Sequence, residues 1–170
     1  MTPRSAAPRT PARPRNAAIS ELAVMVQFGE LVVAIAAQRV ARIVMADEAV
    51  PAPGATPSVQ IGGAVLPAWD LGKLLGFSEP PAAWLIMATG DEPGAPEIAV
   101  GTGPCISVSS HHGISPLPPG VIAAPFAAVA GVFATDAVLR ERGAGHLGLR
   151  VDPLRLIGAP ALAAARRGER

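Results

Sequence analysis

The chain has 170 residues, half of them apolar, which is enough to bury the core of one domain. Residues 1–18 and 161–170 together hold seven basic residues and one acidic residue, whereas the body between them holds seven basic and twelve acidic residues. An acidic body argues against a nucleic-acid-binding surface, and a single cysteine, Cys105, excludes an internal disulfide.

Residues 1–18 consist mainly of Pro, Arg and Ala and contain no apolar run that could join a core or act as a secretory signal. We expect a disordered N-terminal tail over 1–18, a folded domain over 19–160 and a basic C-terminal tail over 161–170. The longest apolar run, at 121–134, is too short to span a bilayer, so we expect a cytoplasmic protein without direct membrane insertion.

The first two predicted elements are the β-rich segments 23–28 and 31–36, which are separated by Gly29 and Glu30. Two strands joined by two residues, with Gly first, are typical of a type II′ hairpin. A helix is the alternative for this Ala-rich stretch, but Gly29 and the β-branched residues favour strands. A third strand is expected over 41–46, and a Pro-containing loop over 48–58.

The segment VQIGGAVLPAWDLGKLLGF, at 59–77, supplies strand material on both sides of a Gly pair, which predicts a bulge or a tight bend. Asp70 is a good N-cap, the following leucines have helical spacing, and Gly76 can end the helix in a left-handed conformation. We therefore predict a strand that ends in one capped helical turn. Its leucines are expected to plug the open end of a small barrel.

The rest of the chain repeats this plan. Strands are expected over 84–90, 96–103, 105–110, 129–135, 137–142 and 146–151. Asp152 and Pro153 then begin a second capped turn with the same Asp-x-x-basic-Leu-aliphatic-Gly pattern that starts at Asp70. Two such closures predict two similar β-barrels, although chance is a real alternative because capped turns are common.

The order of these segments resembles the CheW-like domain of bacterial chemosensory adaptors over residues 23–158. The most specific match is G-x-V-L-P-x-x-D-L-x-x-x-L-G at 63–76. The resemblance implies an all-β fold of two interlocked five-stranded SH3-like barrels, with no active site and no cofactor. It also implies an adaptor between the cytoplasmic tip of a chemoreceptor, a methyl-accepting chemotaxis protein, and the regulatory domain of a histidine kinase. Such adaptors bind through exposed strand edges and a hydrophobic groove between the barrels, and are recruited to membrane receptor arrays.

Three positions depart from the family pattern. The family usually has Arg at the position of Gly62, an acidic residue at the position of Arg42, and an Asp at the position of Gly101. Losing these polar groups would remove charge-assisted contacts. A diverged adaptor that binds a receptor or another partner without kinase coupling is therefore an alternative.

We predict that partners contact the third strand, the glycine bend and the groove. Arg42 either protects an exposed strand edge or docks an acidic partner group. The predicted contact residues are Val40, Arg42, Ile43 and Val44 on the strand, Gly62 and Gly63 at the bend, and Ile98 and Val100 at the groove.

Cys105, His111 and His112 are the residues that invite a catalytic or metal-binding interpretation. Two adjacent histidines point to opposite sides of a strand, and a zinc site needs three or four ligands. We therefore expect neither a metal site nor an enzyme. A small metal-binding or enzymatic barrel stays as an alternative from another class, as does a barrel that only dimerises through its edges.

Overall fold

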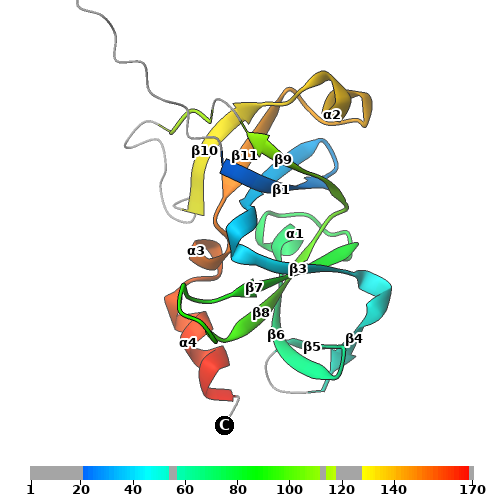
Figure 1. The fold of residues 1–170 in the computed structure, drawn as a ribbon. Coiled ribbons are helices and arrows are strands. Elements are labelled where there is room, and N and C mark those ends of the chain that lie inside the picture. Colours follow the sequence, from blue (N-terminus) through cyan, green and yellow to red (C-terminus); the bar gives the residue numbers. More distant parts are fainter. Residues whose placement is uncertain (1–20, 54–56, 112–113, 118–127, 169–170) are drawn as a thin grey trace, which may run out of the picture.

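The computed structural model describes residues 21–53, 57–111, 114–117 and 128–168. Within these residues strands dominate, and they form two sheets that lie one above the other, as Figure 1 shows. The all-β class is therefore confirmed. The predicted tail over 1–18 lies outside the described residues.

The first sheet has strands from both ends of the chain, in the order β10-β11-β2-β1-β9. Its strands are β1 (Glu21–Phe28), β2 (Leu31–Ala36), β9 (Cys105–His111), β10 (Val129–Ala134) and β11 (Leu147–Val151). The second sheet has the order β3-β7-β8-β6-β5-β4. Its strands are β3 (Val40–Met45), β4 (Ala49–Ala52), β5 (Ser58–Ile61), β6 (Ala64–Asp70), β7 (Ala83–Ala88) and β8 (Glu97–Thr102).

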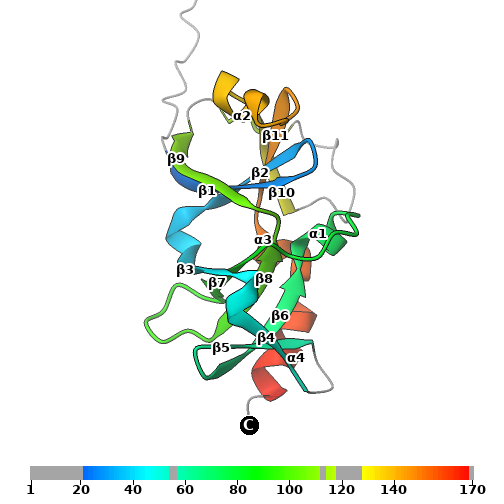
Figure 2. The ribbon, with the colours of Figure 1, turned by 90° about the vertical axis from the view of Figure 1, so that its right-hand side faces the viewer.

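The two units are interlocked through the path of the chain. It starts in the first sheet, crosses through the short 3₁₀ helix η1 (Ala37–Arg39) into the second, and returns through β9, which pairs with β1. In the side view of Figure 2, β9 lies beside β1 in the upper sheet. The strands of the second sheet, β3 to β8, are consecutive in the chain, so the whole second sheet is inserted between β2 and β9 of the first sheet.

Both predicted turns form where glycine permits them. Gly29 has φ +54° and joins β1 to β2 through the directly paired Phe28 and Leu31, as a II′ hairpin requires. Gly62 and Gly63 have φ +58° and +86° and join β5 to β6 in a two-residue turn. The tight bend predicted for this Gly pair is confirmed.

Both predicted helical turns also form. The Asp70 side chain accepts a hydrogen bond from the Lys73 amide at 3.1 Å and caps α1 (Leu71–Leu74). Asp152 accepts from the Leu154 amide at 3.1 Å and caps α3 (Pro153–Ile157), which has Pro at its start. The chain continues into α4 (Ala159–Gly168), so much of the predicted C-terminal tail is helical.

The leucines of α1 do not plug a barrel, contrary to our expectation. Leu71 is fully buried in a cluster shared by the two sheets, which we call the junction core, whereas Leu74 is 42% exposed. Burial of one such side chain stabilises by about 1.5–3 kcal/mol, so the junction core is a large part of what holds the sheets together. It includes Val24, Val26, Val33 and Ile35 from the first sheet and Leu85, Met87, Ile98 and Val100 from the second.

The sheets are open rather than closed barrels, and the second has six strands instead of five. The additional strand is β4, which falls in the predicted loop; Pro51 is tolerated there because β4 is an edge strand. The strand predicted over 137–142 is wrong. Residues 137–141 form the helix α2 (Ala137–Glu141), because Asp136 accepts a hydrogen bond from the Leu139 amide at 2.8 Å and caps its start.

Candidate partner-binding site

Strand β3 is an edge of the second sheet and pairs only with β7 among the described strands. Ile43 and Met45 are 39% and 55% exposed. Arg42, which follows a bulge in the strand after Val40, is exposed as well. An edge with unpaired backbone groups and apolar side chains is a template for strand addition. Met45 was not predicted as a contact residue, although its alternation with buried Val44 places it on the outer face.

Arg42 lies at the rim of the core within the second sheet. It is opposite buried Ile86 and shares a strand face with Val44, which is only 7% exposed. Its Nη1 atom lies 3.9 Å from the position that a Cβ would take on Gly62. The guanidinium therefore lies across the gap between β3 and the β5–β6 turn, two segments that no ladder joins.

Gly62 and Gly63 are exposed, and both have the left-handed backbone that side chains rarely adopt. Arginine at position 62, the usual residue of the resembled family, would be strained in this turn and would lie beside another arginine. The two departures from the family pattern are thus neighbours in space. The predicted contacts at Arg42, Gly62 and Gly63 come together on one surface, beside the exposed part of β3.

Ile98 and Val100 do not border a groove. They are 2% and 0% exposed and belong to the junction core, so a partner cannot touch their side chains while the sheets remain packed. Val44 is likewise buried inside the second sheet. These three predicted contacts were misplaced because alternation shows that a strand has two faces but not which face meets the partner sheet.

Gly101, the third departure from the family pattern, is explained by packing. It is buried opposite Trp84 on β7, and a Cβ at this position would lie 2.6 Å from Cγ of Pro81. Real side-chain contacts are never this short, so Pro81 fills the space that an Asp would need. An Asp at position 101 would therefore overlap the ring of Pro81.

The second sheet also exposes an apolar pair that sequence analysis did not find. Val50 on β4 and Val65 on β6 are 60% and 56% exposed, and each lies opposite Gln60 on β5. The three side chains therefore share one outer face. The sequence could have indicated this pair through strand alternation. Val59, Ile61 and Leu66 point into the core, so their neighbours Gln60 and Val65 must point outward.

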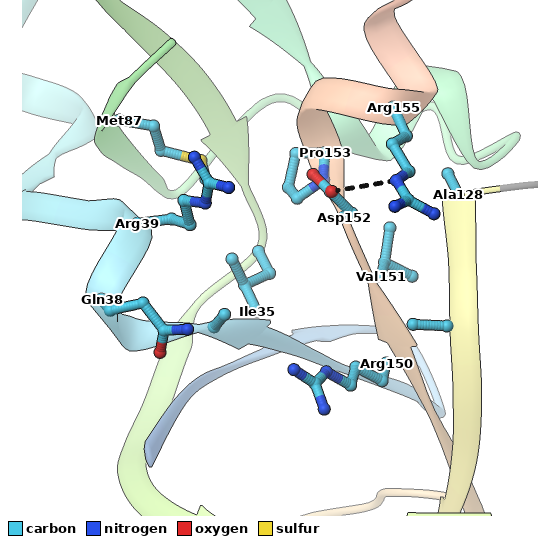
Figure 3. A pocket seen from close by; sticks show the side chains of 12 residues that line it. Ile35, Gln38, Arg39, Met87, Ala128, Arg150, Val151, Asp152, Pro153 and Arg155 are labelled. Carbon is cyan, nitrogen blue, oxygen red and sulfur yellow. Dashed lines mark ion pairs between the residues drawn. The ribbon is translucent and has the colours of Figure 1, made fainter. Parts of the chain in front are cut away.

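A pocket of about 240 Å³ lies between the sheets, at the ends of β2 and β11. Figure 3 shows Gln38 and Arg39 on one side and Arg150, Asp152 and Arg155 on the other. Its polar rim differs from the hydrophobic groove that the resemblance implied. Its twelve lining residues come from separate segments, which sequence patterns do not bring together; they are Ile35, Ala36, Gln38, Arg39, Met87, Ala128, Ala130, Arg150, Val151, Asp152, Pro153 and Arg155.

Cys105 is partly buried at the start of β9, and its Sγ lies 4.0 Å from the Ser107 carbonyl oxygen. Desolvation raises the pKa of this thiol above its ordinary value, despite the opposing hydrogen bond to Ser107. A raised pKa reduces the thiolate fraction and with it the nucleophilicity. Among the described residues no group of three or more His, Cys, Asp and Glu side chains gathers as metal ligands would; His112 lies outside them.

Comparison with known proteins finds the fold but not a sequence family. No protein-family model matches the chain, and no curated protein matches it in sequence. The crystal structure of the scaffolding protein TtCheW from Thermoanaerobacter tengcongensis is similar, with a TM-score of 0.60 and 17% sequence identity, over 88% of this chain and 95% of that one. The chain therefore has a CheW-like fold. In the described part of the chain, no helix is both long enough and apolar enough to cross a bilayer.

Proposed function

We propose that this protein is a non-enzymatic adaptor in bacterial chemosensory signalling, which couples a chemoreceptor to a histidine kinase. The observation that carries the proposal is the structural likeness to a scaffolding protein, which extends over nearly the whole of both chains and so includes both sheets. A fold alone does not define a function. The proposal therefore also rests on a surface suited to protein partners.

That surface is the exposed edge of β3 together with the glycine turn, and we call it the β3 edge surface. Its exposed residues are Arg42, Ile43, Met45, Gly62 and Gly63, and half-buried Val40 borders it while packing against the junction core. A partner strand can hydrogen bond to the backbone groups of β3 that no ladder pairs, apart from the Met45 amide, which donates to Oε1 of Glu48 at 3.4 Å. Ile43 and Met45 can bury apolar area, and Arg42 attracts an acidic group. Recognition by strand addition needs no chemistry at the site, only a free edge and matching side chains.

The proposed partners are the cytoplasmic tip of a methyl-accepting chemotaxis protein and the regulatory domain of the kinase. Both are reached from the cytoplasm, so we place the protein there, recruited to membrane receptor arrays by its receptor. No cofactor is required for this role.

A second candidate is an adaptor that binds a receptor without kinase coupling. It is favoured by the proximity of Arg42 to Gly62, because the two exchanges together place the positive charge on β3 instead of on the turn and leave no acidic residue at either position. A kinase surface matched to the usual acidic residue would be repelled by Arg42. The two candidates differ in one measurable property, which is whether the kinase is bound.

The experiment is a pull-down with the tagged full chain from soluble and membrane fractions of the source organism, followed by mass spectrometry. Recovery of both a chemoreceptor and a histidine kinase supports the coupling adaptor. Recovery of a receptor alone supports the second candidate. Recovery of neither, together with a concentration-dependent dimer or stoichiometric zinc in the purified protein, would reject both in favour of an edge-paired dimer or a metal-binding barrel.

A further inference from the structure

The N-terminal tail contains a segment with the pattern of a polyproline II ligand. It is PRTPAR at residues 8–13, in which Pro8 and Pro11 are followed by Arg13. Because a polyproline II helix has three residues per turn, two prolines at this spacing would share one side of it. Segments of this kind dock on apolar rings, since they lose little conformational entropy when they bind. The adaptor function proposed above gives this segment no role.

A smaller pocket lies beside the Gly29 hairpin, and we call it the proline pocket. Its volume is about 130 Å³, below the roughly 300–1,000 Å³ of typical small-molecule sites, so it suits a single side chain. Phe28 forms one wall and stacks on Phe77, with ring centroids 5.4 Å apart. Pro80 and Pro104 are exposed at the pocket and offer apolar rings at its rim. The other described lining residues are Gln27, Gly29, Asp70, Glu79, Pro81 and Gly103.

The proline pocket is acidic, because Asp70 and Glu79 line it and none of its described lining residues is basic. Oδ1 of Asp70 accepts the capping hydrogen bond from the Lys73 amide, whereas Oδ2 is buried and has no hydrogen-bond partner among the described residues. The Lys73 ammonium lies 3.8 Å from Oδ2, beyond hydrogen-bond distance, and its side chain is 71% exposed. Lys73 therefore offsets part of the charge without donating to this oxygen. A buried acceptor without a donor is unfavourable, so a guanidinium with its five N–H groups is a suitable ligand.

The tail is long enough to reach the proline pocket. It ends where β1 begins, and the pocket lies at the other end of β1, about 23 Å away at roughly 3.3 Å per residue. In polyproline II, at about 3.1 Å per residue, the chain from Glu21 back to Arg13 spans about 25 Å, and back to Pro8 about 40 Å. Residues 1–18 carry four arginines and no acidic residue, so their charge complements that of the pocket.

We propose that residues 8–13 of this chain are the ligand of the proline pocket. The Arg13 guanidinium donates to Oδ2 of Asp70 and pairs with the carboxylate of Glu79. Pro8 and Pro11 pack on the exposed proline rings at the rim. The docked tail ties the start of the chain to the far end of β1, and this role does not depend on the adaptor function.

The first test compares amide chemical shifts of the ¹⁵N-labelled full chain with those of tail variants. Arg13→Glu and the Pro8→Ala, Pro11→Ala double variant should each shift the amides at the pocket, because each releases the segment. Arg4→Glu is the matched control, since it makes the same charge change in the same tail but outside the segment, and it should leave these amides unchanged. The reporter amides are those of Gln27, Gly29, Glu79 and Gly103.

A peptide added to the Arg13→Glu chain tests the pocket itself. Acetyl-Pro-Arg-Thr-Pro-Ala-Arg-amide should give saturable shifts at the reporter amides, and the matched peptide with Ala in place of both Pro should bind at least threefold more weakly. Glu79→Gln in the same chain should weaken binding of the first peptide about threefold, as expected for loss of an exposed ion pair. Glu92→Gln, at an exposed site outside the pocket, should not change it.

Three results would overturn the inference: reporter amides that do not move in Arg13→Glu, equal movement in Arg4→Glu, or movement that disappears on tenfold dilution of the protein. The last result would assign the pocket to the tail of a second copy. All variants should retain the dispersed spectrum of a folded protein. The pull-down described above is independent of this test, so either proposal can fail while the other stands.

Discussion

Arg42 and Gly62 are distant in sequence but close in space, since Nη1 of Arg42 lies 3.9 Å from the position that a Cβ would take on Gly62. An arginine side chain at the edge of β3 fills the space over a turn that needs two glycines. The positive charge of this surface lies on the strand, whereas the resembled family usually has it at the turn. The sequence alone shows both departures from the pattern of the resembled family, but it does not show that they are neighbours in space, because no ladder of hydrogen bonds joins β3 to the turn.

Arg42→Glu should weaken binding to the partners recovered in the pull-down by about tenfold, since it replaces an attractive charge on an exposed surface with a repulsive one. The melting temperature should stay within about 2 °C of the parent, as for surface substitutions in general. Binding is measured by titration calorimetry and unfolding by circular dichroism. Arg142→Glu, at a distant exposed site, is the control and should change neither; a large fall in melting temperature for Arg42→Glu alone would make Arg42 structural.

Gly101→Ala should destabilise the protein by about 1–3 kcal/mol, because its Cβ would overlap Pro81 in a packed site. Gly90→Ala is the matched control, since its Cβ would meet only Ala95 at the ordinary distance of 3.6 Å. Urea unfolding gives both values. Pro81→Ala in the Gly101→Ala background should recover part of the loss, and an equal effect of the two glycine substitutions would refute the packing explanation.

The helical turns and the hairpins were the elements easiest to predict, because their signals are local. Caps at Asp70 and Asp152 and glycines at the turns act over a few residues and do not depend on distant packing. Residues 137–141 were predicted as a strand because the apolar pair Val138 and Leu139 is too short to distinguish the hydrophobic period of a helix from that of a strand. The cap at Asp136 was the signal that identifies this segment as a helix.

Helix α1 should contribute to stability through the junction core rather than through closure of its own sheet. Leu71→Ala should cost about 2–5 kcal/mol because it leaves a cavity between the two sheets. Leu74→Ala, in the same turn but 42% exposed, should cost less than about 1 kcal/mol. Chemical denaturation of the two variants tests this assignment. Similar losses of unfolding free energy for both would contradict the deeper burial of Leu71.

At the level of the whole molecule, the presence of two β units follows from the sequence far better than their strand order or their surface does. Alternation and turns predict two β units over residues 23–158, and the structure has both. Contacts between the sheets decide which face of each strand is buried, and these contacts cannot be read from the sequence. Ile98 and Val100 were therefore predicted to border a groove, whereas they lie in the junction core. The arginine-lined pocket lies at that same junction and has no sequence pattern, because its walls come from η1, β11 and α3.

The most direct test of the adaptor function is co-sedimentation of the purified histidine kinase with receptor-containing membranes of the source organism, in the presence and absence of this protein. We expect the kinase to sediment with the membranes only when the protein is added, and to sediment less when Arg42→Glu replaces the parent chain. A kinase that remains in the supernatant while the protein itself sediments would contradict coupling and leave a receptor-binding protein.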